Sequence, residues 1–274
     1  MPTATDPVRI SNPTAGTSVN VTVDIPNAEC LSVQIAPNNN NTNTLTFASG
    51  SQLTVSGNVS FGDPTRTNRV GVLNMAAGGL LICQGFVDNN TGAANTFIPG
   101  LGEVELTTTN TLPATVMTTF NLLTISGGTT TLGRAITVDT LYAGSGITLA
   151  QGAFLITLTG DFINAGSTLT GSGGLTLSGT NNQYLDSYNT TGTFSCSKTG
   201  GTATLLGSLT STNLTVGTAG GTLNLGSGLS HAISGVVTVS AGTLNGGSAT
   251  LGLSNIAATP FTVSGTGVYS AATS

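Results

Sequence analysis

The chain has 274 residues, of which only 5% are charged, and its formal net charge is −5. The few basic residues are scattered, so no basic patch exists that would favour nucleic-acid binding. No apolar run approaches the roughly 20 residues of a membrane helix, and the first residues lack the basic and apolar segments of a secretion signal.

The composition favours ordered β structure. Glycine occurs 39 times, and hydrophobic residues make up 38% of the chain. Ordinary globular domains carry roughly a quarter charged residues, whereas here Thr, Ser and Asn supply most of the polarity. Val, Ile, Leu and Thr recur in alternating runs, which is typical of strands and not of a disordered chain. A surface with so few titrating groups suits an extracellular location.

Taken in chain order, the pattern predicts four segments. Residues 1–25 contain three prolines and are expected to form a lead-in or an N-terminal cap. Residues 26–90 read as β-helix coils, with Asn38 to Asn41 as a solvated bulge between coils. Residues 91–115 break the pattern and are expected to be an irregular loop or coil. Residues 116–274 form the most regular repeats, and we expect one continuous solenoid.

The strand signals are short and are joined by loose glycine-rich turns. Many have the form apolar-Thr-apolar, as in LTL at 175–177, and no window shows helical periodicity. Tight two-residue hairpin turns are missing. We therefore predict an all-β fold, a right-handed parallel β-helix with about three short strands per coil. Coils of roughly 20 to 25 residues would give about 11 or 12 coils, each rising ~4.8 Å.

A longer spacing also recurs. Phe47, Phe120 and Phe194 follow one another at intervals of about 73 residues, and stacked repeats are known to recur at such fixed intervals. The stretches that begin at Phe120 and Phe194 are similar in sequence: FNLLTISGGTTTLGRAITVDTL and FSCSKTGGTATLLGSLTSTNLTV. We interpret this spacing as a period of about three coils.

Cysteine and histidine give little sign of chemistry. Cys30, Cys83 and Cys196 are widely separated and form no CxxC pair, so they are predicted to be small buried residues in strands. His231 is the only histidine and is expected to be exposed or in a turn. Neither a metal site nor a cofactor is predicted.

Carboxylates offer the best catalytic candidates. Parallel β-helices that cleave polysaccharides need paired carboxylates on one face. Asp139 and Asp161 are separated by about the length of one coil, and Asp186 follows after about one coil more. An enzyme would therefore use Asp139, Asp161 and Asp186 in a shared groove, although carboxylates at coil corners are more often solvated.

Threonine pairs raise a further alternative, because an ice-binding surface needs Thr-x-Thr at one place in every coil. Such pairs occur at 42–46, 129–131, 157–159 and 202–204. These spacings do not correspond to one pair per coil, so an ice-binding solenoid is the weaker alternative.

Several stretches resemble a known group of proteins. TISGGTTTLGRAITV, LTGDFINAGSTLTGSGGLTLSGT and GGTLNLGSGLSHAISGVVTVSAGTLNGG are similar to the repeat regions of very large secreted surface proteins of the Bacteroidetes, exported by the type IX route. The resemblance implies a β-helical stalk of a cell-surface adhesin or filament. The export signal and the C-terminal sorting domain of that group are missing here. The triplet beginning at Asp139 also resembles the short O-glycosylation signal of these bacteria, with Thr140 as acceptor.

The sequence therefore predicts a non-enzymatic structural segment of an extracellular adhesin or filament. We expect the chain to be a mature piece or a fragment of a longer protein. Its expected partners are other copies of itself or adjacent repeats, stacked end to end, together with surface glycans. A carbohydrate-active β-helix, either a lyase or a depolymerase, is the alternative from another class.

Overall fold

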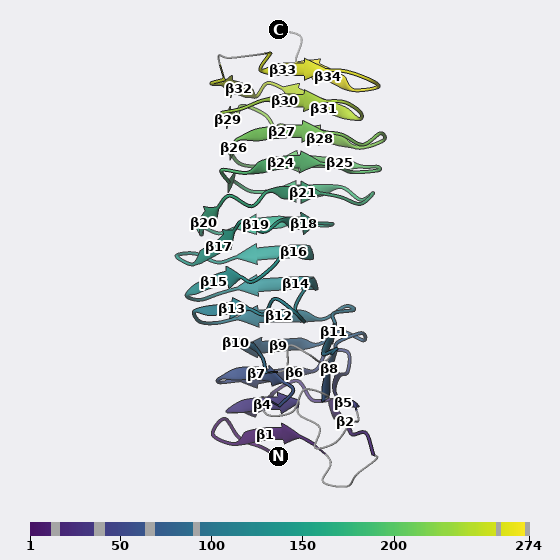
Figure 1. Cartoon of the computed structure of the whole chain (residues 1–274), viewed down its shortest axis with the longest axis vertical. Coiled ribbons are helices and arrows are strands. Elements are labelled where there is room, and N and C mark those ends of the chain that lie inside the picture. The colour runs from purple at the N-terminus through teal and green to yellow at the C-terminus, as the bar shows by residue number, and fades with distance from the viewer. Residues whose placement is uncertain (12–16, 36–41, 64–68, 90–93, 256–258, 272–274) are drawn as a thin grey trace. The chain divides into compact units, whose positions relative to one another are not determined.

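The computed structural model describes residues 1–11, 17–35, 42–63, 69–89, 94–255 and 259–271. These residues form strands and turns, and no helix occurs among them (Figure 1). They divide into two compact units, Met1–Ile136 and Thr137–Ser274, called here the N-terminal and the C-terminal unit. The part of the chain that the structure describes offers no helix that could span a membrane.

In the N-terminal unit, parallel strands stack in three columns. The first contains β1 (Pro7–Ile10), β4 (Ser32–Ile35), β7 (Asn58–Phe61) and β10 (Gly85–Asp88). The second contains β2 (Asn20–Val23), β5 (Thr42–Phe47), β8 (Val70–Asn74) and β11 (Thr96–Ile98). The third contains β3 (Ala28–Cys30), β6 (Gln52–Val55), β9 (Leu80–Cys83), β12 (Glu103–Leu106) and β14 (Thr119–Ile125). Towards the end of this unit, β13 (Asn110–Leu112) pairs with β15 (Thr129–Leu132).

The C-terminal unit is built in the same way. One column contains β18 (Ile156–Leu158), β21 (Leu175–Leu177), β24 (Thr193–Cys196), β27 (Asn213–Val216), β30 (Val237–Val239) and β33 (Phe261–Val263). The next contains β19 (Phe162–Asn164), β22 (Gln183–Leu185), β25 (Thr202–Leu205), β28 (Thr222–Asn224), β31 (Thr243–Gly247) and β34 (Val268–Ala271).

The remaining strands of the C-terminal unit complete its coils. They are β16 (Ile136–Ala143), β17 (Thr148–Gly152), β20 (Thr168–Gly171), β23 (Tyr188–Asn189), β26 (Leu209–Ser211), β29 (Ser230–Ile233) and β32 (Thr250–Leu253). Each unit is thus a stack of coils with about three strands each. Together the described residues make about 12 coils. The prediction of an all-β parallel β-solenoid is confirmed.

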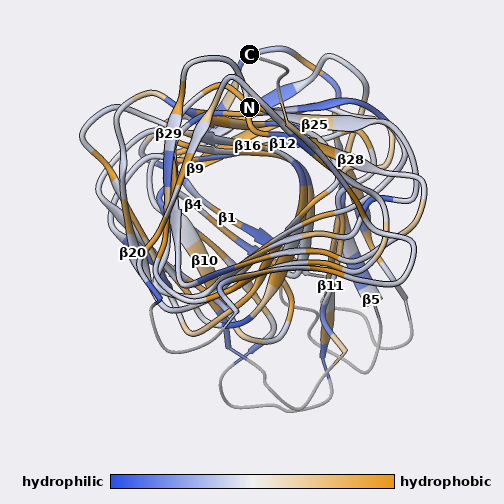
Figure 2. Cartoon of the chain, turned by 90° about the horizontal axis from the view of Figure 1, so that it is seen from above, coloured by the Kyte–Doolittle hydropathy of each residue, from blue (hydrophilic) through white to orange (hydrophobic). Residues whose placement is uncertain are grey.

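The core of each unit is a set of apolar ladders. In the C-terminal unit, one inward ladder carries a fully buried apolar side chain on five successive coils, namely Ile156, Leu175, Phe194, Leu214 and Val237. Seen from above, the strands of each unit run around a common centre, and hydrophobic residues are frequent along them (Figure 2). Parallel strands buried in this way need Val, Ile, Leu and Phe at alternate positions, which explains the apolar-Thr-apolar text.

The long phenylalanine spacing is not the structural repeat. Phe47 lies in β5, in the second column of the N-terminal unit, whereas Phe194 lies in β24, in a different kind of column of the C-terminal unit. Coil length also varies. Leu175 pairs with Phe194 across a short coil, whereas Gln52 pairs with Leu80 across a much longer one. Because coils differ this much in length, no fixed spacing marks equivalent positions.

Two predicted segment assignments also differ from the structure. Residues 1–25 include β1 and β2, which pair in parallel with β4 and β5, so they belong to the first coil instead of forming a separate lead-in. Residues 91–115 contain β11, β12 and β13 in regular register. Pro7 is the exposed first residue of β1, and Pro99 and Pro113 directly follow β11 and β13, which are positions where parallel stacking tolerates proline. The predicted bulge at Asn38 to Asn41 lies outside the described residues.

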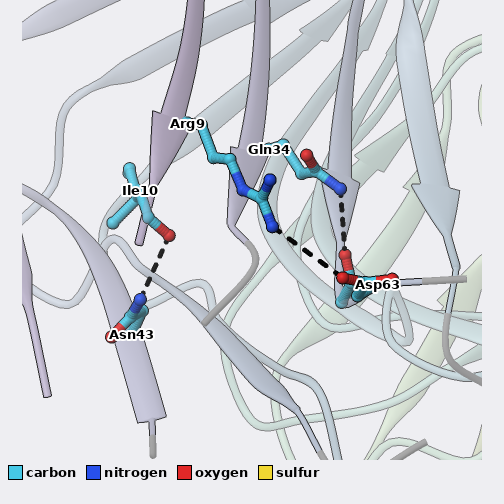
Figure 3. A network of polar contacts seen from close by, with 6 residues as sticks. Arg9, Ile10, Gln34, Asn43 and Asp63 are labelled. Carbon is cyan, nitrogen blue, oxygen red and sulfur yellow. Dashed lines mark hydrogen bonds and ion pairs between the residues drawn. The ribbon is translucent and has the colours of Figure 1, made fainter. Parts of the chain in front are cut away.

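A few polar side chains join coils of the N-terminal unit (Figure 3). Asn43 is fully buried: its Nδ2 donates to the carbonyl of Ile10 over 3.1 Å, and its Oδ1 accepts from the amide of Val19 over 3.0 Å. Arg9 and Asp63 form an ion pair at 3.8 Å. The buried amide satisfies backbone groups that would otherwise lack partners inside the stack.

Candidate functional site

The three predicted aspartates do not share one column of the C-terminal unit. The step from Leu141 to its partner Phe162 is 21 residues, and the step from Phe162 to its partner Leu185 is 23 residues. The aspartates are instead 22 and 25 residues apart. The amide of Gly160 donates to the carbonyl of Asp139 over 2.8 Å, so Asp139 neighbours Gly160 and not Asp161. The predicted alignment therefore fails, because neither coil step equals the spacing of the aspartates.

Each of these carboxylates accepts a hydrogen bond from an adjacent coil. The Asp139 Oδ1 accepts from the Thr159 hydroxyl over 2.9 Å. The Asp161 Oδ1 accepts from the amide of Tyr184 over 2.8 Å, and the Asp186 Oδ2 accepts from the amide of Asn164 over 2.9 Å. Hydrogen bonds of this kind tie coils together, so a structural role accounts for all three side chains.

Thr140 is half-buried on β16, beside Asp139.

Residues that bind metals do not gather elsewhere either. Within the ranges that the structure describes, no group of three or more His, Cys, Asp or Glu side chains is placed to hold a metal ion.

His231 is buried, contrary to the prediction of an exposed or turn position. It lies on β29 with only 3% of its surface exposed. Its Nδ1 accepts from the amide of Leu209 over 3.0 Å, and its Nε2 lies 2.7 Å from the carbonyl of Leu225. Because the first contact requires an unprotonated Nδ1, the ring is neutral with its proton on Nε2. Burial lowers the pKa of His231, and the hydrogen bond to Leu225 opposes this shift.

Lys198 is the second buried titratable group that sequence reasoning missed. Its side chain is fully buried, and its Nζ donates to the carbonyl of Asn181 over 2.7 Å and to the Gln183 Oε1 over 2.9 Å. The Gln183 Nε2 donates to the carbonyls of Leu158 and Gly160. Burial lowers the pKa of Lys198. The network therefore connects three successive coils through side chains inside the stack.

A second buried network occurs in the C-terminal unit. The Tyr188 hydroxyl donates to the Gln151 Oε1 over 2.7 Å, and the Gln151 Nε2 donates to the carbonyls of Phe154 and Gly174. Burial raises the pKa of Tyr188. Both networks satisfy backbone carbonyl groups inside the stack.

The cysteines behave as predicted. Cys30, Cys83 and Cys196 are buried in strands and are free of disulfides. Burial raises the pKa of Cys30 to about 11 and that of Cys83 to about 12. Such thiols are protonated at neutral pH and are poor nucleophiles.

A regular column of hydroxyl groups lies on the outward side of β18, β21, β24, β27, β30 and β33. This hydroxyl column consists of Thr157, Thr176, Ser195, Thr215, Thr238 and Thr262. Within it, the Thr215 hydroxyl donates to the Ser195 hydroxyl over 2.9 Å. Single hydroxyl residues thus recur once per coil in this column, although Thr-x-Thr pairs do not. Serine replaces threonine once, and the steps between members are unequal, which hides the column in the sequence.

A shallow hollow follows a third column of the C-terminal unit, over β23, β26, β29 and β32. Its volume is about 370 Å³, and hydroxyl groups from successive coils line it, among them Thr191, Thr212, Ser234 and Ser254. None of the residues lining it is charged. Hydroxyl and amide groups in such a hollow suit a neutral ligand with its own hydroxyl groups.

Comparison with known proteins returned no similarity that would place the chain in a family: no family model, curated protein or solved structure matches it.

Proposed function

We propose that this chain is a non-enzymatic structural segment, a stalk built of stacked β-coils within an extracellular bacterial adhesin or filament. One observation carries the proposal: the carboxylates best suited to catalysis are each engaged in hydrogen bonds between adjacent coils. Side chains committed to holding coils together are poorly placed to act as a general acid and a nucleophile.

The mechanism would be mechanical. Backbone hydrogen bonds run between coils, and the apolar ladders inside exclude water, so each coil is held by the coils on both sides. Such a stack resists bending and separates a binding tip from the cell. The low charge and the similarity to secreted Bacteroidetes repeats support an extracellular location and export by the type IX route, with Thr140 as a candidate site of O-glycosylation.

A polysaccharide panel tests the non-enzymatic role. The purified chain would be incubated with neutral, uronic-acid and sulfated polysaccharides, and new reducing ends and unsaturated products would be measured. We expect no cleavage. Cleavage that disappears in the Asp161→Asn variant but persists in an Asn164→Asp control would establish the carbohydrate-active alternative instead.

Single-molecule pulling tests the mechanical role. With the chain held by its two termini, we expect a series of unfolding events, each releasing roughly one coil, because neighbouring coils are the main source of stability in a stacked repeat. Collapse of each unit in one step at low force would contradict a load-bearing stalk.

Ice binding is a second candidate, and the hydroxyl column favours it. Adjacent coils are ~4.8 Å apart, so this column presents six hydroxyls at a regular interval in the C-terminal unit. The measurement is thermal hysteresis and adsorption to ice. Thr176→Tyr and Thr215→Tyr would abolish both if the column binds ice, whereas Thr204→Tyr on the neighbouring column would not. A wild-type chain without hysteresis removes this candidate.

A further inference from the structure

The N-terminal unit has an open apolar cavity at its first coil. The cavity measures about 530 Å³, and apolar residues of β1, β2 and β3 make up much of its lining, among them Val8, Ile10, Val21 and Cys30. Met1 to Thr3 and the acidic residues Asp24 and Glu29 also line it. Coverage of the first coil is uneven: Ile10 and Cys30 are buried, but Val21 is 39% exposed, whereas Leu45, directly opposite it on β5, is 2% exposed. Among the described residues, the interior of the stack is therefore open to solvent beside Val21, at the first coil.

The backbone is open at the same place. Among the described strands, β1 pairs only with β4, β2 only with β5 and β3 only with β6. Their other edges present amide and carbonyl groups that a further parallel strand can pair with. We call β1, β2 and β3, together with this cavity, the N-face.

The C-terminal unit ends on a complementary surface. Val263 is 45% exposed, whereas Val239, opposite it on β30, is fully buried. Tyr269 is 43% exposed, whereas Leu244, opposite it on β31, is fully buried. The ring of Phe261 packs edge-on against that of Tyr269 with centroids 4.9 Å apart. We call β33 and β34 the C-face; each pairs on one side only among the described strands.

The two faces match in chemistry and in polarity. The C-face strands, FTV and VYSA, carry no charge and present Val and Tyr side chains. The N-face offers a mostly apolar cavity that such side chains can fill, with Asp24 and Glu29 as the acidic residues of its lining. Inside each unit, successive coils are joined by hydrogen bonds between parallel strands, so that one edge of each strand pairs with the coil before it and the other edge with the coil after it. The same kind of contact is available between the C-face of one molecule and the N-face of another.

We infer that the C-face of one copy of this chain seats on the N-face of a second copy, so that parallel pairing and the apolar core continue across the junction. This inference deepens the proposed structural role and rests on it. Because the two faces differ, the contact is heterologous, and its repetition gives rings or open chains of molecules rather than two-fold symmetric dimers.

Sedimentation velocity over a range of concentrations tests the inference with two blocking variants. Val21→Lys places a charge in the N-face cavity, and Val263→Lys places one on the C-face. Both sites are already partly exposed, so both variants are expected to fold, which thermal melting verifies. We expect the wild type to form oligomers that grow with concentration, and each variant alone to remain monomeric.

The mixture of the two variants is the decisive sample. Val21→Lys keeps an intact C-face and Val263→Lys keeps an intact N-face, so an equimolar mixture should stop at the heterodimer. The control Leu206→Lys changes a side chain that is 56% exposed and belongs to neither face, and it should assemble like the wild type. Full assembly of either blocked variant by itself would show that like faces pair and would overturn the inference.

A wild-type chain that stays monomeric at every concentration would also overturn the inference, and the faces would then have another occupant. That result leaves the structural role standing, whereas polysaccharide cleavage in the panel described above would overturn the role itself. The two failures are thus distinguishable.

Discussion

At the scale of single residues, the buried polar groups of the C-terminal unit depend on the coils around them. Lys198 and His231 have side-chain nitrogens hydrogen-bonded to backbone carbonyls, to a backbone amide or to a buried amide side chain. The sequence predicted buried cysteines correctly because small apolar residues in strand patterns are usually inside. It failed for His231, because a single histidine carries no periodic signal and its partners come from other coils.

We predict that His231 makes the chain less stable in mild acid. Its pKa is lowered from the ordinary 6.5 by burial, so between the two pKa values the unfolded chain binds more protons than the folded one. Stability is therefore fully present above pH 6.5 and falls as the pH decreases, by up to about 1.4 kcal/mol per pH unit. Denaturant titrations from neutral pH to about pH 5 measure it.

The matched variant is His231→Gln, which keeps hydrogen-bonding capacity but does not titrate. It should be less stable than the wild type at neutral pH and should lose the slope below pH 6.5. If the free energy of unfolding of this variant depends on pH as steeply as that of the wild type, the acid sensitivity belongs to other groups.

Lys198 gives a second prediction at this scale, because it is the only lysine of the chain. Its amine is fully buried, so an amine-reactive ester should label it roughly tenfold or more slowly in the folded chain than in denaturant, since labelling requires opening of the coil. Peptide mass spectrometry reads the site. The control Thr199→Lys adds an exposed neighbouring amine that should react at once; equal labelling of both sites would contradict the burial of Lys198.

At the scale of strands and turns, the sequence predicted what each coil contains but not how long each coil is. Alternation of apolar and hydroxyl residues identified strands such as β21 and β27 directly. The partners of these strands could not be found, because turns change in length from coil to coil and the register step varies. The aspartate alignment failed for this reason, and the hydroxyl column was hidden for the same reason.

Glycine in the turns has two separable roles, which a pair of variants distinguishes. Gly146 and Gly201 have φ values of +74° and +64°, but a Cβ on Gly146 meets open space, while one on Gly201 would clash with the carbonyl oxygen of Thr180 in the previous coil. Gly146→Ala should cost only the left-handed strain of about 1 to 2 kcal/mol. Gly201→Ala should cost clearly more, because it also pushes two coils apart.

Denaturant unfolding of the two variants measures the difference in the free energy of unfolding. Equal losses of stability would mean that the turn at Gly201 can shift without disturbing its neighbour, and that coil spacing is less tightly fixed than the contacts indicate.

At the scale of the whole molecule, the fold class followed from composition and alternation alone, since few folds accommodate so much glycine, so little charge and no helical periodicity. The function did not follow in the same way. Resemblance supplied a biological setting, and neither the three aspartates nor the single histidine forms a convergent site in the described chain. The exposure of the side chains on the two end faces depends on which other coils cover them, and the sequence alone does not show this.

The low content of charged residues predicts how the stability of the molecule depends on salt. With 5% charged residues, screening by salt has few interactions to weaken, so the free energy of unfolding should change by less than about 1 kcal/mol between low and molar sodium chloride. The measurement is denaturation by urea, which is itself uncharged. A large loss of stability in salt would reveal ionic contacts far stronger than the Arg9–Asp63 pair.

The interior ladders have one more consequence, for how such a chain can change over evolutionary time. Leu175, Phe194, Leu214 and Val237 occupy the same place on successive levels, and each contacts similar neighbours above and below. Unequal recombination that removes or duplicates a whole level would bring one such side chain against another of the same kind. Chains of this type can therefore gain or lose length in whole levels without redesigning the rest, and the genes of close relatives should differ by insertions of about twenty codons.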